Sequence, residues 1–242
     1  MPSTSYTFFT VKKHPSFSII LPTCNEADNL PLLLDRFYIL FKTRKLNGEI
    51  ILVDDHSTDT TLILAKKYEK KLPLTIIPST VQKGKSNALL LGIRSVHTQY
   101  IVTIDADNQY HPKSIIPLLS CVKKGADLAI AHRRYKNGSP IRILASRCLS
   151  YFLCSFLVPL HVDALGGLKV FRRSISKNWT HPLTPWSFDL ELTWKAHCRG
   201  CEIQQIVVPV YARTKGESKL QPLQDTISLI ATALKLRFTT RE

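Results

Sequence analysis

The sequence has no apolar run long enough to cross a membrane. Its longest such stretch, Cys148 to Leu160, is interrupted by serines and a proline and falls far short of the roughly 20 apolar residues of a spanning helix. The segment from Met1 to Lys13 has neither an extended apolar core nor a cleavage site of small residues, so we expect no signal peptide. These absences favour a cytoplasmic protein that is soluble or lies peripherally on the cytoplasmic face of a membrane.

The sequence also lacks a repeated cysteine motif. Its six cysteines include one C-x-x-C, formed by Cys198 and Cys201, and no second pair follows. A single pair is a weak indication of a zinc or redox site, and free thiols are the ordinary state in a chain without an export signal. We therefore expect neither a disulfide framework nor a structural zinc site.

Acidic residues are scarce. The chain has 18 Asp and Glu against 33 Lys and Arg, which gives a formal net charge of +15 at pH 7. Such a balance favours polyanionic partners, whether nucleic acid, an anionic membrane face or phosphorylated ligands. No zinc-finger spacing, recognition-helix pattern or aromatic RNA-binding signature is present, so a basic nucleic-acid-binding protein is the weaker interpretation and we expect no nucleic acid partner.

The chain contains no internal repeat and no low-complexity linker. Of its 242 residues, 44% are hydrophobic, which is enough for an ordinary core. We therefore expect a single domain over residues 1–242, with its core from about residue 17 to 220 and a C-terminal helix over 221–242.

Short apolar runs alternate with stretches of helical periodicity. The predicted strands are 17–22, 49–53, 74–78, 100–104, 127–131 and 203–211. The predicted helices are 27–42, 59–68, 85–96, 112–123, 190–197 and two amphipathic helices, one long or broken over 141–160 and one over 223–238. This alternation predicts an α/β fold with a mostly parallel, Rossmann-like sheet flanked by helices. Ligands of such sheets bind at the carboxyl ends of the strands.

Two aspartates follow the predicted strand 100–104. Asp105 and Asp107 are two residues apart, so their carboxylates can point to the same side. Mg²⁺ and Mn²⁺ favour a few carboxylate oxygens together with phosphate oxygens of a substrate. A metal held there would neutralise charge on a departing diphosphate. The alternative is a solvated turn, because D-x-D is common by chance.

A second acidic pair, Asp54 and Asp55, follows the strand 49–53. Carboxylates at a strand end can accept hydrogen bonds from a nucleobase or from ribose hydroxyls, and we expect one of the two to be structural and the other to face ligand. Ser57 or Thr58 could instead cap the next helix. Asn25 could likewise cap the helix that follows the first strand.

In their order along the chain, these motifs resemble those of the inverting glycosyltransferase family two, which has the GT-A fold. The matching segments are Pro22-Thr23-x-Asn25-Glu26, Val53-Asp54-Asp55-x-Ser57-Thr58-Asp59, Lys83-Gly84-Lys85-x-x-Ala88 and Asp105-Ala106-Asp107. Later segments resemble dolichyl-phosphate mannosyltransferases and related polyprenyl-phosphate glycosyltransferases; they are 131–135, 163–171, 187–191 and 215–219. The chain departs from the family pattern at Cys24 and His56, where tyrosine and glycine are usual.

The resemblance implies a role for each matching residue. The nucleotide would be held by Pro22, Thr23, Glu26, Asp55, Lys85 and Asp105. Mg²⁺ or Mn²⁺ would be held by Asp105, Asp107 and Gln109. The acceptor phosphate would meet Arg134 and Arg147. The catalytic residues would be Asp105, Asp107, Arg134, Asp189, Glu191, Arg213 and Lys219.

The implied reaction is inverting transfer of mannose or glucose from a nucleotide diphosphate sugar, of the GDP-mannose or UDP-glucose type, to a polyprenyl or dolichyl phosphate. A phosphate monoester has a second pKa of about 6 and is largely a dianion at neutral pH, so it needs no strong general base. An anionic membrane surface and a membrane-anchoring subunit are the further partners we expect. The alternatives are a glycan or protein acceptor, or a catalytically silent subunit with the same fold.

Overall fold

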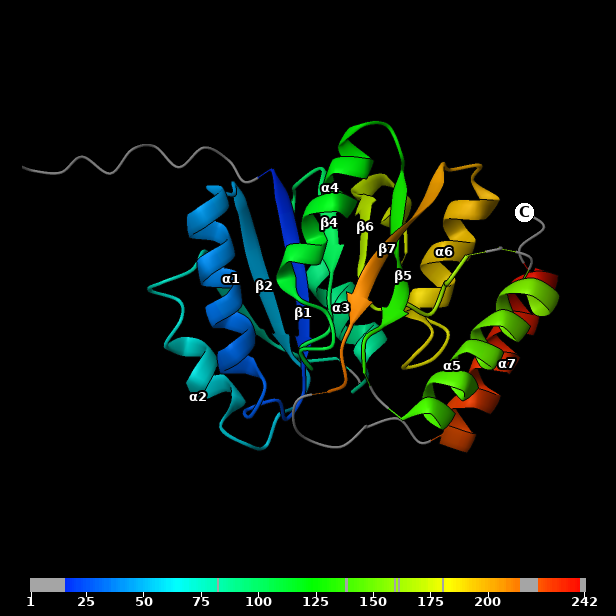
Figure 1. Cartoon of the computed structure of the whole chain (residues 1–242), viewed down its shortest axis with the longest axis horizontal. Helices are drawn as coiled ribbons and strands as arrows, with labels where there is room; N and C mark the ends of the chain where they lie inside the picture. The colour runs from blue at the N-terminus through cyan, green and yellow to red at the C-terminus, as the bar shows by residue number, and fades with distance from the viewer. Residues whose placement is uncertain are drawn as a thin grey trace, which may run out of the picture.

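The computed structural model describes residues 16–81, 83–137, 139–158, 160, 162–179, 181–213 and 222–239. These residues form a seven-stranded sheet in the order β3-β2-β1-β4-β6-β5-β7 (Figure 1). The strands are β1 (Phe17–Thr23), β2 (Gly48–Asp54), β3 (Leu74–Pro78), β4 (Tyr100–Thr103), β5 (Leu128–Tyr135), β6 (Lys169–Arg172) and β7 (Ile203–Val210). Neighbouring strands pair in parallel except at β6, which is antiparallel to β4 and to β5.

Helices cover both faces of this sheet. They are α1 (Leu30–Arg44), α2 (Thr61–Lys66), α3 (Lys85–Arg94), α4 (Ile115–Lys123), α5 (Pro140–Phe152), α6 (Phe188–Cys198) and α7 (Pro222–Thr239), with the short turns η1 (Pro112–Ser114), η2 (Leu153–Leu157) and η3 (Arg173–Ser176). Strand residues alternate between the two faces: Ile19 and Leu21 pack with α1 and α4, whereas Ile20 packs with α3. Burial on both faces explains why the strands are continuously apolar.

A third apolar cluster lies beside the β5–β7 end of the sheet. There η2, α6 and α7 bury Leu153, Trp194, Leu229 and Ala233 against one another. The amphipathic stretch predicted over 141–160 is therefore broken, since α5 ends at Phe152 and a π-helical turn follows. Among the residues that the structure describes, no helix combines the length and the apolar character needed to span a membrane.

The predicted parallel α/β arrangement is confirmed, and each predicted strand is present within a few residues of its expected bounds. The sequence pattern did not predict β6. This strand is only four residues long, begins with a charged residue and enters between β4 and β5 in the opposite direction, so it breaks the strand–helix alternation. Its reversed direction brings its first residue, Lys169, to the edge where the parallel strands end.

Candidate active site

Several of the predicted site residues gather where the parallel strands end. In Figure 1 the arrowheads of β2, β5 and β7 point to this edge of the sheet. The loops after β1, β4 and β7 meet there: Arg213 Nη2 lies 3.2 Å from Asp107 Oδ2 and 3.9 Å from Glu26 Oε1. Side chains more than a hundred positions apart in the sequence thus form one charged cluster, as expected for a ligand site of a parallel sheet.

The aspartate pair after β4 forms the centre of this cluster. The Asp105 side chain is 27% exposed, whereas that of Asp107 is 10% exposed. Asp107 Oδ1 accepts a hydrogen bond from the Gln109 N–H at 3.1 Å. Burial, followed by the nearby charge of Asp105, raises the pKa of Asp107 above its ordinary value. Gln109 therefore acts on Asp107 through its backbone.

Lysines and carboxylates alternate on the other side of Asp105. Lys85 Nζ lies 2.7 Å from Asp105 Oδ1 and 3.0 Å from Asp189 Oδ2. Lys169 Nζ lies 2.7 Å from Asp189 Oδ1. Burial alone would raise the pKa of Asp189, but its attraction to Lys169 and Lys85 outweighs burial and lowers that pKa below its ordinary value. Asp189 is therefore an ionised carboxylate with both oxygens bonded.

Lys169 is the residue of this cluster that sequence reasoning missed. Its side chain is 0% exposed, and burial lowers its pKa below the ordinary value for lysine. The available signal was a lysine directly before the apolar residues Val170 and Phe171, because a charged side chain is almost never fully buried unless it is paired.

The acids at the end of β2, Asp54 in the strand and Asp55 after it, are both buried and both bonded. Asp55 Oδ2 accepts a hydrogen bond from the Gly84 N–H at 2.9 Å, and Asp54 Oδ2 accepts one from the Ser57 N–H at 3.1 Å. Asp54 Oδ1 is buried and accepts no hydrogen bond from the described residues. Gly84 has φ of 145°, in a region that favours glycine, and this backbone turn aims its N–H at Asp55. Both carboxylates therefore organise the loop, although only one was expected to do so.

The turn after β1 fixes its neighbours in the same way. Thr23, which follows Pro22 at the end of β1, is buried. Its hydroxyl donates a hydrogen bond to the Val53 carbonyl at 3.3 Å. Glu26 Oε2 accepts a hydrogen bond from Asn29 Nδ2 at 2.7 Å. Asn25 was expected to cap the next helix, and this prediction was wrong.

Instead, Asn25 has φ of 49° and its Oδ1 accepts a hydrogen bond from the Thr58 N–H at 2.7 Å, which ties the first loop to the second. The prediction that Ser57 or Thr58 caps α2 was also wrong. The helix α2 begins at Thr61, later than the sequence pattern indicated. The Thr61 N–H therefore donates to Asp59 Oδ1, at 2.9 Å.

The arginines predicted for the acceptor lie at the end of β5 and on α5. Arg147 is exposed, with its guanidinium 5.7 Å from the centre of the Tyr135 ring. Arg133 forms a bidentate pair with Asp163, at 2.7 and 2.8 Å, and lies 5.8 Å from the same ring. Successive strand residues point to opposite faces, so the exposed Arg134 lies on the other face of β5 from Arg133. The structure thus brings Arg147, rather than Arg134, next to the Arg133–Asp163 pair.

The last two predicted catalytic residues are Glu191 and Lys219. Glu191 is buried, and its Oε1 accepts hydrogen bonds from the Leu183 N–H at 2.7 Å and from the Ser187 hydroxyl. These bonds hold the loop before α6 in place, and burial raises the pKa of Glu191. Lys219 lies outside the described residues.

The donor set fits a divalent metal of the magnesium type. Within the described part of the chain, no group of three or more His, Cys, Asp or Glu side chains has metal-binding geometry. Mg²⁺ needs no such cage, because it is commonly held by one or two carboxylates together with substrate phosphates and water. Asp105 and Asp107 would supply these carboxylates. Burial, and after it the nearby charge of Asp105, raises the pKa of Asp107, and a bound cation would offset the repulsion between the two carboxylates.

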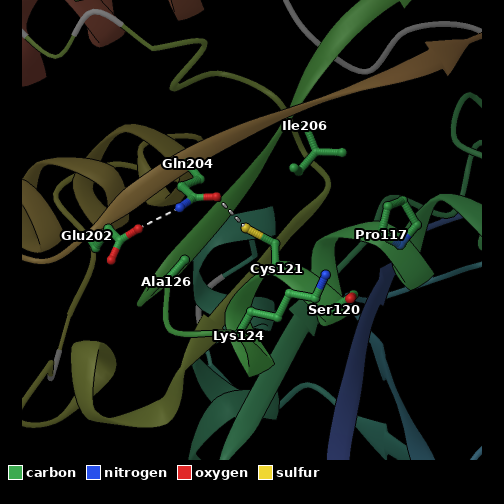
Figure 2. A pocket seen from close by; sticks show the side chains of 8 residues that line it. All are labelled: Pro117, Ser120, Cys121, Lys124, Ala126, Glu202, Gln204 and Ile206. Atoms are coloured by element: carbon green, nitrogen blue, oxygen red, sulfur yellow. Dashed lines mark hydrogen bonds between the residues drawn. The ribbon is translucent and has the colours of Figure 1, made fainter.

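A hollow of about 420 Å³ lies elsewhere, between α4 and β7, and none of the predicted site residues lines it (Figure 2). Its lining consists of Pro117, Ser120, Cys121, Lys124, Ala126, Glu202, Gln204 and Ile206. Cys121 Sγ donates to Gln204 Oε1 at 3.0 Å across it. Gln204 Nε2 in turn donates to Glu202 Oε1 at 2.5 Å, so these three side chains bond one another along the wall.

The family model for glycosyl transferase family 2 matches residues 18–179. The chain belongs to this family. The fold class predicted from the motifs, an α/β sheet of the GT-A type, is confirmed as well.

Curated relatives are similar over different lengths. A dolichol-phosphate mannosyltransferase of Pyrococcus furiosus is 39% identical over 121 residues, which cover 50% of this chain and 34% of the relative. A polyprenol monophosphomannose synthase of Mycolicibacterium smegmatis is 28% identical over 226 residues, covering 87% of this chain and 83% of that protein. The chain thus spans only about a third of the archaeal relative.

Among solved structures, a glucosyl-3-phosphoglycerate synthase of Mycobacterium tuberculosis, in complex with Mn²⁺, UDP-glucose and phosphoglyceric acid, has a TM-score of 0.73 to this chain. The two are 20% identical, and the match covers 94% of this chain and 81% of that one. This likeness concerns the fold.

Proposed function

We propose that this chain is a metal-dependent, inverting glycosyltransferase that moves a hexose from a nucleotide diphosphate sugar to a polyprenyl phosphate. The observation that carries the proposal is the carboxylate pair Asp105 and Asp107, which lies at the carboxyl end of β4 among the side chains of Lys85, Arg213 and Glu26. Relatives named for dolichol phosphate and polyprenol support this acceptor class. Mannose and glucose, on GDP or UDP, are the donors to test first.

The donor side of the proposal uses the loops after β1, β2 and β4. Asp105 and Asp107 hold Mg²⁺ or Mn²⁺, and Gln109 fixes Asp107 through its N–H. Pro22, Thr23, Glu26 and Asp55 border the nucleotide. A bound divalent cation supplies charge neutralisation at the departing diphosphate. Lys85 and Arg213 are cations of the chain within reach of the same place, and they orient phosphate oxygens.

The acceptor side needs alignment more than it needs a base. A phosphate dianion attacks the anomeric carbon opposite the diphosphate, which inverts that centre. Both Asp189 oxygens bond to lysines, which supports a role in orienting cations and sugar rather than in taking a proton. Arg134 and Arg147 attract the acceptor phosphate, Arg213 and Lys219 are further catalytic cations, and Glu191 holds the loop before α6.

We also propose that the side formed by α5 and α7 rests on an anionic membrane at its cytoplasmic face. Exposed apolar side chains occur on both helices; they are Leu144, Tyr151, Phe152, Ile227, Leu234 and Phe238. Arg147, Lys235 and Arg237 add positive charge to the same helices. Apolar and basic groups together favour interfacial binding, although a single interfacial element binds modestly, so an anchoring subunit is part of the proposal.

The test is transfer of label from a panel of nucleotide sugars into polyprenyl phosphate with Mn²⁺ present. Label in the organic phase is the expected result. Label found solely in a water-soluble glycan or protein acceptor would rule out the lipid acceptor and leave the glycosyltransferase assignment intact. Flotation with anionic liposomes tests the membrane surface, since binding should weaken with salt that screens charges over about 8–10 Å. Absence of flotation at low salt would refute the membrane surface.

A further inference from the structure

The fully buried ammonium of Lys169 is bonded in every direction. Its Nζ lies 3.0 Å from the Ala164 carbonyl oxygen and 2.7 Å from Asp189 Oδ1, and it also bonds the Gly166 carbonyl. A lysine ammonium has three protons to donate, and these acceptors use all of them. Burying an ion pair is rarely better for stability than packing apolar side chains of similar volume. The pair is therefore better explained by what it holds in place.

The first thing that Lys169 holds is the chain of charges that leads to Asp105. Asp189 bridges the two lysines, with one oxygen 2.7 Å from Lys169 and the other 3.0 Å from Lys85. Lys85 in turn reaches Asp105 Oδ1 at 2.7 Å and is 20% exposed. The position of one oxygen of Asp105 thus depends on Lys169 through two intervening side chains.

The second thing that Lys169 holds is the backbone beside the other oxygen. Gly167 follows the Gly166 carbonyl that Lys169 binds, and it lies against Asp105. A Cβ added to Gly167 would lie 2.0 Å from Asp105 Oδ2, so this oxygen rests directly on the glycine. Both oxygens of Asp105 are therefore placed by groups that Lys169 fixes.

We propose that Lys169 is a positioning residue that sets the orientation of the Asp105 carboxylate and, through it, the geometry of the divalent-metal site. The inference rests on the proposed function, because it takes Asp105 as a metal ligand. Lys169 itself touches neither metal nor substrate. Groups that orient metal ligands from outside the coordination shell typically change metal affinity about 10–100-fold when they are replaced.

Comparison of two metals separates positioning from charge and from stability. Mg²⁺ requires a near-octahedral site with short bonds, whereas Ca²⁺ accepts looser and more variable geometry. Loss of one positive charge shifts the affinities for both ions in the same direction and to a similar extent. Loss of orientation weakens Mg²⁺ more than Ca²⁺, so the ratio of their dissociation constants reports positioning.

The experiment measures the dissociation constants of Mg²⁺ and Ca²⁺ with GDP or UDP present. Each ion displaces bound Mn²⁺, and electron paramagnetic resonance detects the Mn²⁺ that is released. For Lys169→Met we expect the ratio of the Mg²⁺ to the Ca²⁺ dissociation constant to rise on the order of tenfold, and for Lys169→Arg to rise less. Leu33→Ala is the matched control. Leu33 is fully buried on α1, and its apolar side chain takes no part in the charged chain from Lys169 to Asp105, so its truncation lowers stability and should leave the ratio unchanged.

A folded Lys169→Met protein with the wild-type ratio would overturn the positioning role alone. If that variant does not fold, Lys169→Met combined with Asp189→Leu removes both buried charges, and we expect a folded protein whose ratio is still raised. Recovery of the wild-type ratio in this double variant would count against the proposal. A wild-type protein that binds none of the three ions with either nucleotide would overturn the metal site, and the positioning role with it.

Discussion

The half of the sheet formed by β1, β2, β3 and β4 differs from the half formed by β5, β6 and β7 in how its functional side chains reach the site. In the first half the carboxylates come from the segments that follow parallel strands: Asp55 directly follows β2, and Asp105 lies shortly after the end of β4. In the second half the contacts come from a reversed strand, from α6 and from the segment after β7, through Lys169, Asp189 and Arg213. The positions of the first-half carboxylates thus follow from the local sequence, whereas the contacts from the second half depend on tertiary packing.

The largest effect is expected where the two halves touch, at Gly167. Gly167→Ala places a methyl group 2.0 Å from Asp105 Oδ2, so Asp105 must move. We expect transfer to fall at least about 10²-fold, together with weaker Mn²⁺ binding. Gly125→Ala is the control, because Gly125 has φ of +140° and no atom within 4 Å of its added Cβ. This control should lose stability and keep Mn²⁺ affinity; equal loss of Mn²⁺ affinity in both variants would assign the effect to backbone strain.

In the second half, the Arg133–Asp163 pair, which connects β5 to the segment before β6, should govern stability. Burial alone would raise the pKa of Asp163, but its bonds to Arg133 outweigh burial and lower that pKa below its ordinary value. Its contribution is therefore present above the unfolded-state pKa and is lost as the pH falls through the folded-state pKa. Asp163→Asn should cost about 1.5–3 kcal/mol at pH 7, and the difference from wild type should shrink in acid.

Denaturant melts of both proteins at several pH values measure this difference. A gap that stays constant from neutral to acidic pH would show that the charge of Asp163 contributes nothing to stability.

In the first half, Asp55 tests whether a loop-organising acid also binds nucleotide. Asp55→Ala should weaken GDP or UDP binding by about 1.5–3 kcal/mol, the value of a hydrogen bond to a charged group. Isothermal titration measures this affinity, and circular dichroism checks the fold. Unchanged nucleotide affinity would show that Asp55 only organises the loop, through its hydrogen bond from the Gly84 N–H.

The smallest effect has the opposite sign. Arg213 contacts Asp107 from the second half and competes with any cation at that carboxylate. Arg213→Met should therefore tighten Mn²⁺ binding without nucleotide by roughly fivefold, equivalent to about 1 kcal/mol for a partly exposed pair, while it slows transfer. Arg199→Met, which removes bonds to backbone carbonyls next to η3, is the control. Weaker Mn²⁺ binding in Arg213→Met would show that Arg213 supports the carboxylates rather than competing for them.

The difference between the halves also explains what the sequence could predict. Strands β1 to β4 and the positions of Asp55, Asp105 and Asp107 follow from apolar periodicity and from the rule that parallel strands end at one edge. Lys169 and the loop-holding role of Glu191 do not follow, because each depends on a partner chosen by packing. Asn25 is a further example of a partner that the sequence did not reveal. The sequence pattern favoured a helix cap, but the Asn25 side-chain oxygen accepts a hydrogen bond from the loop after β2.

Sugar transfer by Asp107→Ala in saturating Mn²⁺ tests the central claim most directly. Asp107 lies in the loop after β4 and belongs to none of the apolar clusters, so its replacement removes a proposed metal ligand and opens no core cavity. We predict that label in polyprenyl phosphate falls by about 10²–10³-fold, the usual effect of removing one preorganised electrostatic group, while the melting temperature is preserved. Wild-type turnover by a folded Asp107→Ala protein, or undiminished wild-type activity in excess chelator, would contradict the assignment of the carboxylate pair as the metal site.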